Sequence, residues 1–367
     1  MTETIPGLFL SLPEVLVLLG ALALAAARWL PPAARRPVTI GAGAVLVPSA
    51  IVLGIVGIRW QMLPVLAGAA VASAFALPPL LRRGAGRRAR SRAVVDAPVA
   101  GGGERFPVVL FSPESGGVRS QNTAWAEELA SHGYLVAALD HLYDSTVVVL
   151  ADGRTIRATT ASSGDRDRDE ELAAGWTAVR AVDLGFVLTQ LERLDRGETA
   201  DPLTGRLDTG RAAVAGHSLG GAAALQAARQ DRRFDAVVDL DGYPHGPTAP
   251  ALEQPALALT QEITAGTDPR YLPRLSEALE HSTATSYRLT VPGAGHLTFM
   301  DGPLYLPPVP SIVGTLGRTE SPRVVAAATL AFLDATLRGR PGDPADTLRA
   351  YGTVSSSGAR RTGTPTP

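Results

Sequence analysis

The 367-residue chain contains no cysteine, which excludes disulfides, thiolate metal sites and a cysteine nucleophile. It also contains no lysine, so that all 34 basic residues are arginine. Because the chain is rich in alanine and glycine, we attribute this bias to coding composition rather than to phosphate recognition. The formal net charge is only -1, so the composition gives no indication of nucleic acid or of another strongly charged partner.

Histidine is scarce, and the spacing of the six histidines excludes a common metal motif. None of them forms the His-x-x-x-His pair that binds zinc from one face of a helix. We therefore expect neither a metal nor another cofactor.

Charged residues are also rare in residues 1–81, where three long apolar stretches follow one another. These stretches, Leu8–Trp29, Val38–Ile58 and Gln61–Leu81, are each close to the ~20 residues that a helix needs to cross a bilayer. A cleaved signal peptide is the alternative for the first stretch, but that stretch lacks a basic start and two more follow it. We predict a membrane domain over residues 1–81, with three transmembrane helices at about 8–29, 38–58 and 61–81.

The arginines predict an orientation for these helices. Arg28, Arg35 and Arg36 flank the first loop, and more arginines follow the third stretch, whereas the second loop has only Arg59. The positive-inside rule then places the N-terminus outside and the rest of the chain in the cytoplasm. We expect a multi-pass protein of the cell membrane, with residues 82–103 as an Arg- and Gly-rich linker that could also contact membrane lipids.

From residue 104 the pattern becomes that of an α/β protein. Expected strands cover 106–111, 134–139, 211–215, 236–240, 255–259 and 286–291, with a hairpin over 145–157. Expected helices cover 122–132, 172–194, 221–229, 271–281 and 322–337. This alternation predicts a mostly parallel sheet covered by helices on both faces, in a catalytic domain spanning 104–338. The Gly-, Pro-, Ser- and Thr-rich tail, 339–367, is predicted to be disordered.

The segment Gly216-His217-Ser218-Leu219-Gly220 fits the G-x-S-x-G nucleophile elbow, because an expected strand precedes it and an expected helix follows it. A serine hydroxyl is a weak nucleophile and needs a base, usually a histidine oriented by a carboxylate. In the α/β-hydrolase fold the order along the chain is serine, acid, histidine. Ser218 is therefore the candidate nucleophile, and its partners should follow it.

Three histidines follow Ser218. His296 lies in a Gly-rich loop directly after an expected strand, where the base of this fold belongs. His281 ends an amphipathic helix and is expected to be a surface residue, while His245, beside Tyr243, could line the pocket. We therefore assign His296 as the base.

Four carboxylates are candidates for the acid of the triad. Asp241 closes the strand that follows the elbow unit, and Asp239 lies deeper in the same strand. Glu262 and Asp268, after the next strand, are rivals because many hydrolases of this fold place the acid there. On position alone, Asp241 is favoured.

An oxyanion hole needs two backbone N–H groups. One is supplied by the residue after the nucleophile, Leu219, and the other by the loop Pro113–Gly117 after the first strand. Proline has no N–H, so Glu114 and Ser115 are the candidate donors in that loop.

Several segments together resemble a known family. They are Val-Leu-Phe-Ser at 109–112, Ser120 to Tyr134, Asp140-His141, Gly216 to Gly221, Leu240-Asp-Gly242 and Gly295-His296. On these motifs, residues 106–338 resemble the plasma-type platelet-activating-factor acetylhydrolases and their bacterial relatives, and more distantly the cutinase-like polyester hydrolases. The resemblance implies an α/β-hydrolase fold, metal-free hydrolysis of short or oxidised acyl esters, a Ser218–Asp241–His296 triad and an oxyanion amide from Ser115. It also favours Asp241 over Glu262.

The sequence departs from that family at one position. Where the family has His-Gly or Pro-Gly after the first strand, this chain has Pro113-Glu114. A glutamate here could oppose the negative charge that develops on the oxyanion, or modulate the pocket together with His217, Tyr243 and His245.

We therefore expect a membrane-anchored serine hydrolase that acts on small-molecule or lipid esters through an acyl-enzyme. The alternatives are a thioesterase or peptidase with the same catalytic groups, or a catalytically silent binding module that keeps the hydrolase shape. The sequence does not define an oligomeric state.

Overall fold

The computed structural model describes residues 91–160, 162–246, 251–264, 267–306, 309–310 and 312–358. The chain divides into two compact units, Met1–Arg88 and Ala89–Pro367, and all described residues belong to the second. The three predicted transmembrane helices therefore lie outside the described residues. Of the predicted linker, residues 91–103 are described, and they form neither helix nor strand and are mostly exposed.

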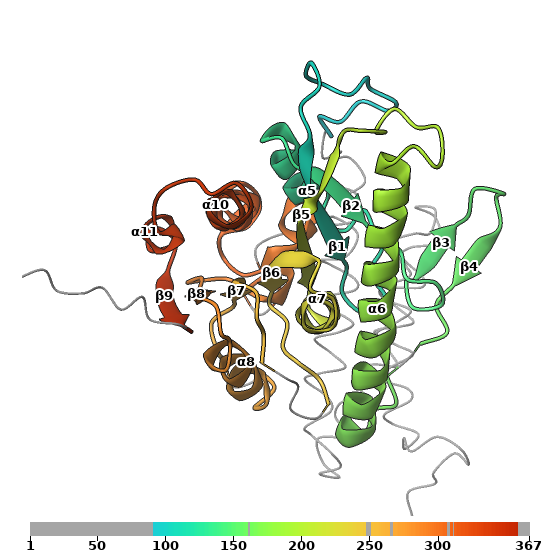
Figure 1. Cartoon of the computed structure of the whole chain (residues 1–367). Helices are drawn as coiled ribbons and strands as arrows, with labels where there is room; N and C mark the ends of the chain where they lie inside the picture. The colour runs from blue at the N-terminus through green and yellow to red at the C-terminus, as the bar shows by residue number, and fades with distance from the viewer. Residues whose placement is uncertain are drawn as a thin grey trace, which may run out of the picture. The chain divides into compact units, whose positions relative to one another are not determined.

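A seven-stranded sheet forms the centre of the described unit, in the order β2-β1-β5-β6-β7-β8-β9 (Figure 1). The strands are β1 (Phe106–Ser112), β2 (Leu135–Ala138), β5 (Leu207–His217), β6 (Phe234–Leu240), β7 (Ala256–Thr260), β8 (Ser286–Thr290) and β9 (Thr353–Ser357). All neighbouring strands run parallel except β8 and β9, which are antiparallel. The predicted, mostly parallel α/β sheet is thus confirmed.

Helices cover both faces of the sheet (Figure 1). Side chains alternate along each strand, so Val109 and Phe111 of β1 pack in one apolar cluster while Val108 and Leu110 pack in the other. The first face is covered by α5 (Thr123–Ser131), α10 (Gly317–Leu337) and α11 (Pro344–Leu348). The second is covered by α6 (Arg166–Asp195), α7 (Leu219–Gln230) and α8 (Tyr271–Glu280). Two short elements, η2 (His296–Phe299) and α9 (Gly302–Tyr305), lie between β8 and α10 along the chain.

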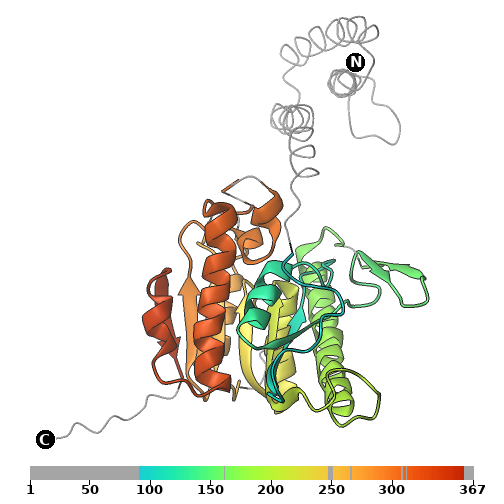
Figure 2. The same cartoon turned by 90° about the horizontal axis from the view of Figure 1, so that it is seen from above.

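The hairpin predicted over 145–157 is present as a separate two-stranded sheet of β3 (Val147–Val149) and β4 (Thr155–Arg157). It projects from the domain, away from the central sheet (Figure 2). Val148 of β3 is buried, whereas its neighbours Val147 and Val149 are exposed.

Helix α6 begins six residues earlier than the sequence pattern predicts. The side chain of Asp165 accepts hydrogen bonds from the amides of Asp167 and Arg168, and this N-cap starts the helix before its apolar periodicity begins. Within the described part of the chain, α6 is also the single helix long and apolar enough to cross a membrane. Leu184 and Leu188 of this helix are fully buried against the sheet.

The prediction of a disordered tail from residue 339 is wrong for residues 344–357, and the domain does not end at 338. Helix α11 buries Ala345 and Leu348, and β9 then pairs with β8 at the edge of the sheet. The sequence of β9, Thr-Val-Ser-Ser-Ser, has almost no apolar pattern, since its backbone pairs with β8 and, of its side chains, Val354 packs against the core and Ser357 donates to the carbonyl oxygen of Leu279. A strand held by its backbone gives little signal in side-chain composition.

Candidate active site

Ser218 lies at a sharp turn between β5 and α7. Its φ of 56° is in the left-handed region, which non-glycine residues rarely adopt. The flanking glycines permit this turn, because a Cβ on Gly216 would lie 2.0 Å from the carbonyl oxygen of Gly220. The strand–turn–helix arrangement expected of a nucleophile elbow is therefore present, with the serine partly exposed at the end of the strand.

Asp241 and His296 meet at the same edge of the sheet. Nδ1 of His296 donates a hydrogen bond to Oδ2 of Asp241 over 2.6 Å. The other carboxylate oxygen of Asp241 accepts hydrogen bonds from the Tyr271 hydroxyl, at 2.6 Å, and from the amide of Gln261, at 2.8 Å. These contacts orient the imidazole and leave Nε2 of His296 free to take up a proton.

The pKa of His296 reflects two opposing effects. Burial lowers the pKa of this histidine, but the hydrogen bond and negative charge of Asp241, together with the charge of Glu114, outweigh burial and raise it above its ordinary value. A stronger base at this position is better able to accept a proton from a serine.

The rival carboxylates have other partners. Glu262 accepts the amide N–H of Gly293 over 2.9 Å, and Asp268 pairs with Arg270. Asp239 is almost fully buried beneath Asp241, and burial, with the nearby charge of Asp241, raises its pKa well above the ordinary range. Asp239 accepts the amide N–H of Gly242 at 2.9 Å in the turn and makes no hydrogen bond to His296 within the described residues.

The other two histidines after Ser218 have positions and partners different from those of His296. His281 is exposed at the C-terminus of α8. His245 lines the same cavity as Ser218, and its Nδ1 lies 3.0 Å from a carboxylate oxygen of Glu170. The ring of Tyr243 packs against His245 at a centroid distance of 4.5 Å, and these are the two of the four expected pocket residues, Glu114, His217, Tyr243 and His245, that line this cavity.

The two predicted oxyanion amides lie at the cavity and have no partner among the described residues. The N–H of Glu114 donates to the Gln121 side chain, and that of Gly116 donates to Asp144, which leaves Ser115 between them. Ser115 and Leu219 both line the cavity that contains Ser218. Two free backbone donors near a serine can stabilise the negative oxygen of a tetrahedral intermediate.

The cavity has a volume of ≈360 Å³ and is lined by three large aromatic side chains among small and polar residues. Trp176 of α6 and the rings of Tyr243 and Tyr271 line it, the two tyrosines packing edge to face at 5.5 Å. The triad candidates Ser218, Asp241 and His296 also line this cavity. An ester bound here would contact apolar and aromatic surface on one side and the polar groups on the other.

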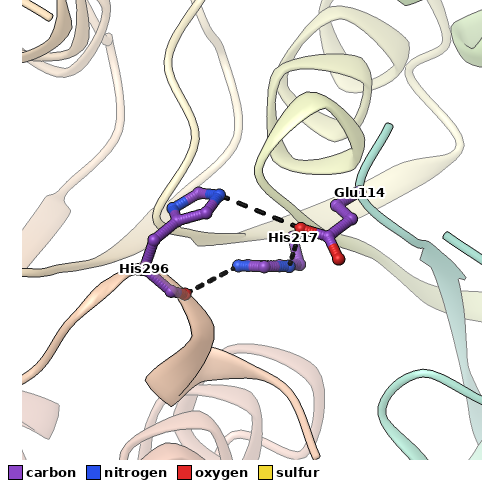
Figure 3. Close-up of side chains that lie close together, drawn as sticks. All are labelled: Glu114, His217 and His296. Carbon is purple, nitrogen blue, oxygen red and sulfur yellow. Dashed lines mark hydrogen bonds and ion pairs between the residues drawn. The ribbon is translucent and has the colours of Figure 1, made fainter. Parts of the chain in front are cut away.

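Behind the cavity, His217 is fully buried and supports the loop of His296 (Figure 3). Its Nε2–H donates to the carbonyl oxygen of His296 at 3.0 Å, and its Nδ1 accepts from the side chain of Gln121 at 2.9 Å. Burial, and then the charge of His296, keep the pKa of His217 well below its ordinary value. A neutral His217 fits this pair of hydrogen bonds, so its position is structural rather than pocket-lining.

The carboxylate of Glu114 points toward both histidines (Figure 3). One oxygen lies 3.8 Å from Nδ1 of His217 and 4.0 Å from Nε2 of His296. Burial raises the pKa of Glu114, although His296 and Arg180 act in the opposite direction. The departure from the family pattern therefore places an acid beside the nitrogen that must receive the serine proton.

Glu114, His217 and His296 also have the side chains of a metal site, with one ligand atom each within 4.8 Å of the others. The His217 atom, Nδ1, already accepts a hydrogen bond from Gln121. An ion would need to displace that bond and to occupy Nε2 of His296, the nitrogen that a triad requires. The absence of a metal stays a prediction from the sequence.

Sequence reasoning missed three side chains that support this site: Gln121, Tyr271 and Arg180. Gln121 and Tyr271 gave no usable signal, since both are common in helices and loops. Arg180 did give one, because it falls on the buried stripe of α6 with Thr177, Leu184 and Leu188. A charged residue on an apolar helix face indicates a specific buried partner.

Comparisons with known proteins point to one family. The family model described as "Platelet-activating factor acetylhydrolase, isoform II" matches residues 80–155 and 162–340. A platelet-activating factor acetylhydrolase from Cavia porcellus is 31% identical over 161 residues, which is 38% of this chain and 36% of the relative. A probable 1-alkyl-2-acetylglycerophosphocholine esterase from Arthroderma benhamiae is 28% identical over 207 residues, 54% of this chain and 49% of the relative. The matches thus span about a third to a half of the length of these curated relatives.

Among solved structures, a ferulic acid esterase from Streptomyces cinnamoneus is similar, with a TM-score of 0.56 and 33% sequence identity. The match covers 71% of this chain and 74% of that chain. This structural similarity to an esterase agrees with the α/β-hydrolase fold that the sequence predicts. Since the family model covers well over half of the sequence, the chain belongs to the platelet-activating factor acetylhydrolase, isoform II family.

Proposed function

We propose that this chain is a serine hydrolase that cleaves carboxylic esters through a Ser218–His296–Asp241 triad. The single observation that carries the proposal is one cavity that gathers Ser218, His296, Asp241 and two unpartnered amides, those of Ser115 and Leu219. The strained turn at Ser218 and the short bond between His296 and Asp241 support it.

In the proposed reaction, Oγ of Ser218 attacks the ester carbonyl carbon while Nε2 of His296 takes the hydroxyl proton. The carbonyl oxygen becomes an oxyanion held by the amides of Ser115 and Leu219. The intermediate expels the alcohol, which receives the proton from His296, and leaves an acyl-enzyme. Water, deprotonated by His296, then releases the carboxylic acid and restores Ser218.

For the substrate we propose an ester with a short acyl group, such as an acetylated glycerophospholipid. The support is family membership and the printed names of the relatives, which are an acetylhydrolase and an alkylacetylglycerophosphocholine esterase. A second candidate is an aryl or cinnamoyl ester. The aromatic wall of Trp176, Tyr243 and Tyr271 favours it, and the similar solved structure is named a ferulic acid esterase.

We further propose that residues 1–81 anchor the enzyme in the membrane, with the hydrolase unit on the cytoplasmic side. The support is the three apolar stretches and the distribution of arginines. Protease treatment of intact cells tests the orientation. Cleavage of the hydrolase unit from outside would contradict the cytoplasmic assignment.

The activity is tested on detergent-solubilised full-length protein with a fluorophosphonate probe, beside the Ser218→Ala variant. We expect covalent labelling of the unmutated protein and none of the variant. Turnover of 1-alkyl-2-acetylglycerophosphocholine, of methyl ferulate and of p-nitrophenyl esters of increasing acyl length then ranks the substrate classes. An unmutated protein that neither labels nor hydrolyses any of these esters would falsify the proposal.

A further inference from the structure

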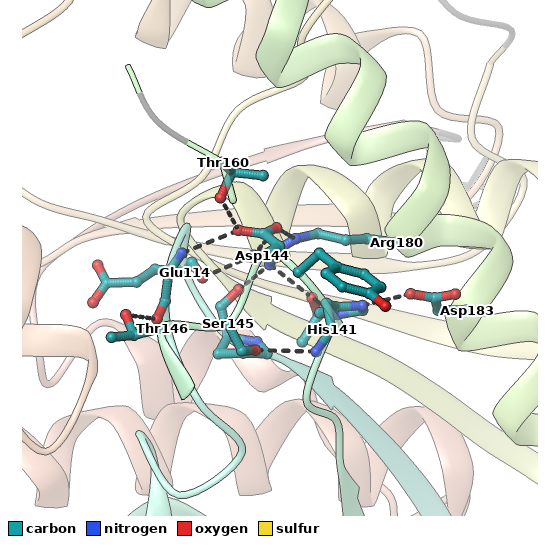
Figure 4. Close-up of polar contacts among 12 residues, drawn as sticks. Glu114, His141, Asp144, Ser145, Thr146, Thr160, Arg180 and Asp183 are labelled. Carbon is teal, nitrogen blue, oxygen red and sulfur yellow. Dashed lines mark hydrogen bonds and ion pairs between the residues drawn. The ribbon is translucent and has the colours of Figure 1, made fainter. Parts of the chain in front are cut away.

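The loop that supplies the Ser115 amide is attached to a buried arginine of α6. Arg180 is only 1% exposed and contributes all three of its guanidinium nitrogens (Figure 4). Nη1 donates to the carbonyl oxygen of Pro113, and Nη2 donates to that of Glu114 at 3.0 Å. Two consecutive carbonyls of the oxyanion loop are therefore held by one rigid group.

The third nitrogen of Arg180 is connected through Asp144 to the other end of the same loop. Nε donates to Oδ2 of Asp144 at 2.7 Å, and Oδ1 of Asp144 accepts the amide N–H of Gly116 at 3.2 Å (Figure 4). Thr160 donates to the same Oδ1 at 3.3 Å. The Arg180–Asp144 pair thus contacts the loop on both sides of Ser115.

The amides of this loop show why that arrangement matters for Ser115. The N–H of Glu114 donates to Gln121, that of Gly116 to Asp144, and that of Gly117 back to the carbonyl of Glu114. The Ser115 amide is the remaining one in Glu114–Gly117, and it has no partner among the described residues. Ser115 lines the cavity that contains Ser218, so this N–H lies in a loop whose neighbouring amides are held in place at the cavity wall.

The residue before the loop is supported from the same helix. Nε2 of His141 accepts a hydrogen bond from Oγ of Ser112 at 2.9 Å, and Nδ1–H of His141 donates to Asp183 at 2.7 Å. Asp183 lies three residues after Arg180 on α6, so one turn of this helix supports both Ser112 and the carbonyls that follow it. The rotation and depth of α6 therefore determine where the loop lies.

A buried charge pair is costly unless its polar groups are satisfied, and an apolar pair of the same volume is often as stable. The planar fork of arginine, with five N–H donors, can satisfy a carboxylate and two carbonyls at once, which the single ammonium of lysine cannot. Burial lowers the pKa of Arg180, yet its partners are all acceptors, so the group is used as a charged donor. This cost is explained if the pair orients a functional loop.

We propose that Arg180, through Asp144, is the positioning residue of the oxyanion hole. It contacts neither substrate nor the reacting atoms, and it acts by fixing the direction of the Ser115 N–H. The inference rests on the proposed ester hydrolysis. It assigns to α6 a role in transition-state stabilisation that is separate from its packing against the sheet.

The test compares Arg180→Lys, Arg180→Met and Asp144→Asn with the unmutated full-length protein. Loss of one oxyanion donor lowers kcat by about 10²–10³-fold. Misplacement of the Ser115 amide should be less severe, so we expect kcat to fall by about 30-fold or more and KM to change by less than about threefold. The kcat of Arg180→Lys should fall nearly as far as that of Arg180→Met, because lysine keeps the positive charge but lacks the planar fork of N–H donors. A lysine variant with normal kcat would show that charge alone matters and would overturn the proposal.

A second readout separates positioning from a general structural effect. Affinity for a trifluoromethyl ketone, whose adduct with Ser218 carries an oxyanion, should fall in proportion to kcat/KM across the variants. Arg233→Met is the matched control, since Arg233 also links α6 to the end of α7, through Gly185 and Asp231, but lies outside this loop. It should lower thermal stability while kcat stays within about twofold. If Arg180→Met does not fold, Asp144→Asn, which keeps the side-chain volume, decides the outcome.

The outcomes also distinguish this inference from the proposed function. If the unmutated protein is neither labelled by the fluorophosphonate nor active on esters, ester hydrolysis itself is wrong. If it is labelled and Arg180→Met and Asp144→Asn are labelled equally fast, with unchanged kcat, then the positioning role is wrong. A rise in KM without a fall in kcat overturns it as well, because the residue would then act on substrate binding.

Discussion

The described part of the molecule contains two groups that each consist of one serine, one histidine and one aspartate. The two groups differ in the exposure of the serine, in the pKa of the histidine and in the backbone donors nearby. Ser218, His296 and Asp241 lie at an open cavity, whereas Ser112, at the end of β1, is linked through His141 to Asp183 of α6. The second set has the complete hydrogen-bonded chain, with 2.9 Å from serine to histidine and 2.7 Å from histidine to aspartate. A linked Ser–His–Asp chain is therefore not sufficient for a catalytic site.

Burial and neighbouring backbone donors explain why the Ser218 group is the catalytic candidate and the Ser112 group is not. Ser112 is fully buried, so no ester can approach it, while Ser218 is partly exposed at the cavity. Burial lowers the pKa of His141 despite the hydrogen bond that it donates to Asp183, whereas the pKa of His296 is raised. The free amides of Ser115 and Leu219 lie at the cavity of Ser218. Access, basicity and oxyanion donors together distinguish the candidate catalytic set from the structural one.

The largest effect is expected at the two serines. Ser218→Ala should lower kcat/KM for a p-nitrophenyl ester by about 10⁴-fold or more, because the nucleophile is lost. Ser112→Ala should lower it by about threefold at most, through a slightly looser oxyanion loop. Steady-state kinetics of both variants at equal protein concentration measure this. A large loss in the Ser112 variant, with activity retained in the other, would reverse the assignment of the two sets.

Substitution of His296 should affect mainly activity, whereas substitution of His141 should affect mainly stability. His296→Ala should remove activity and leave the free energy of unfolding nearly unchanged, since this side chain is 37% exposed. His141→Ala should lower the free energy of unfolding by about 2 kcal/mol, because it removes a side chain that is only 3% exposed and takes a hydrogen bond from the fully buried Ser112. Its kcat should stay within about fivefold of the unmutated value. Urea unfolding and ester kinetics on the same samples check both halves, and a stable but inactive His141 variant would contradict them.

The smallest effect is expected in the pH profile, at Glu114. His296 must be neutral to act as a base, so activity is present above its pKa and is lost as the pH falls through it. The negative charge of Glu114 raises the pKa of His296, and Glu114→Gln should therefore move the acid limb of kcat/KM to lower pH. Asp183→Asn, which removes a charge beside His141 instead, should leave that limb in place. An acid limb that stays fixed or moves to higher pH in the Glu114 variant would argue against its coupling to His296.

Much of the fold could be predicted from the sequence because it depends on local patterns. Buried strands such as Phe106–Ser112 and Phe234–Leu240 consist mainly of apolar residues, and the Gly-x-Ser-x-Gly turn has steric requirements that only glycines meet. Strand β9 could not be predicted, since backbone pairing with β8 needs no particular side chains. The start of α6 was missed for a related reason, because its polar cap precedes the apolar stripe.

For the candidate site, the sequence alone predicted the identity and order of Ser218, Asp241 and His296 at one edge of the sheet, while the choice of Ser115 over Glu114 as an amide donor came from the family resemblance. It could do so because parallel strands end at a common edge and the elbow needs a specific motif. Only the tertiary structure decided which Ser–His–Asp set is accessible, where the Glu114 carboxylate points, and that Arg180 holds the oxyanion loop. Burial and side-chain direction depend on contacts between segments such as β1 and α6, which are separated by more than fifty residues along the chain, and no local pattern encodes them.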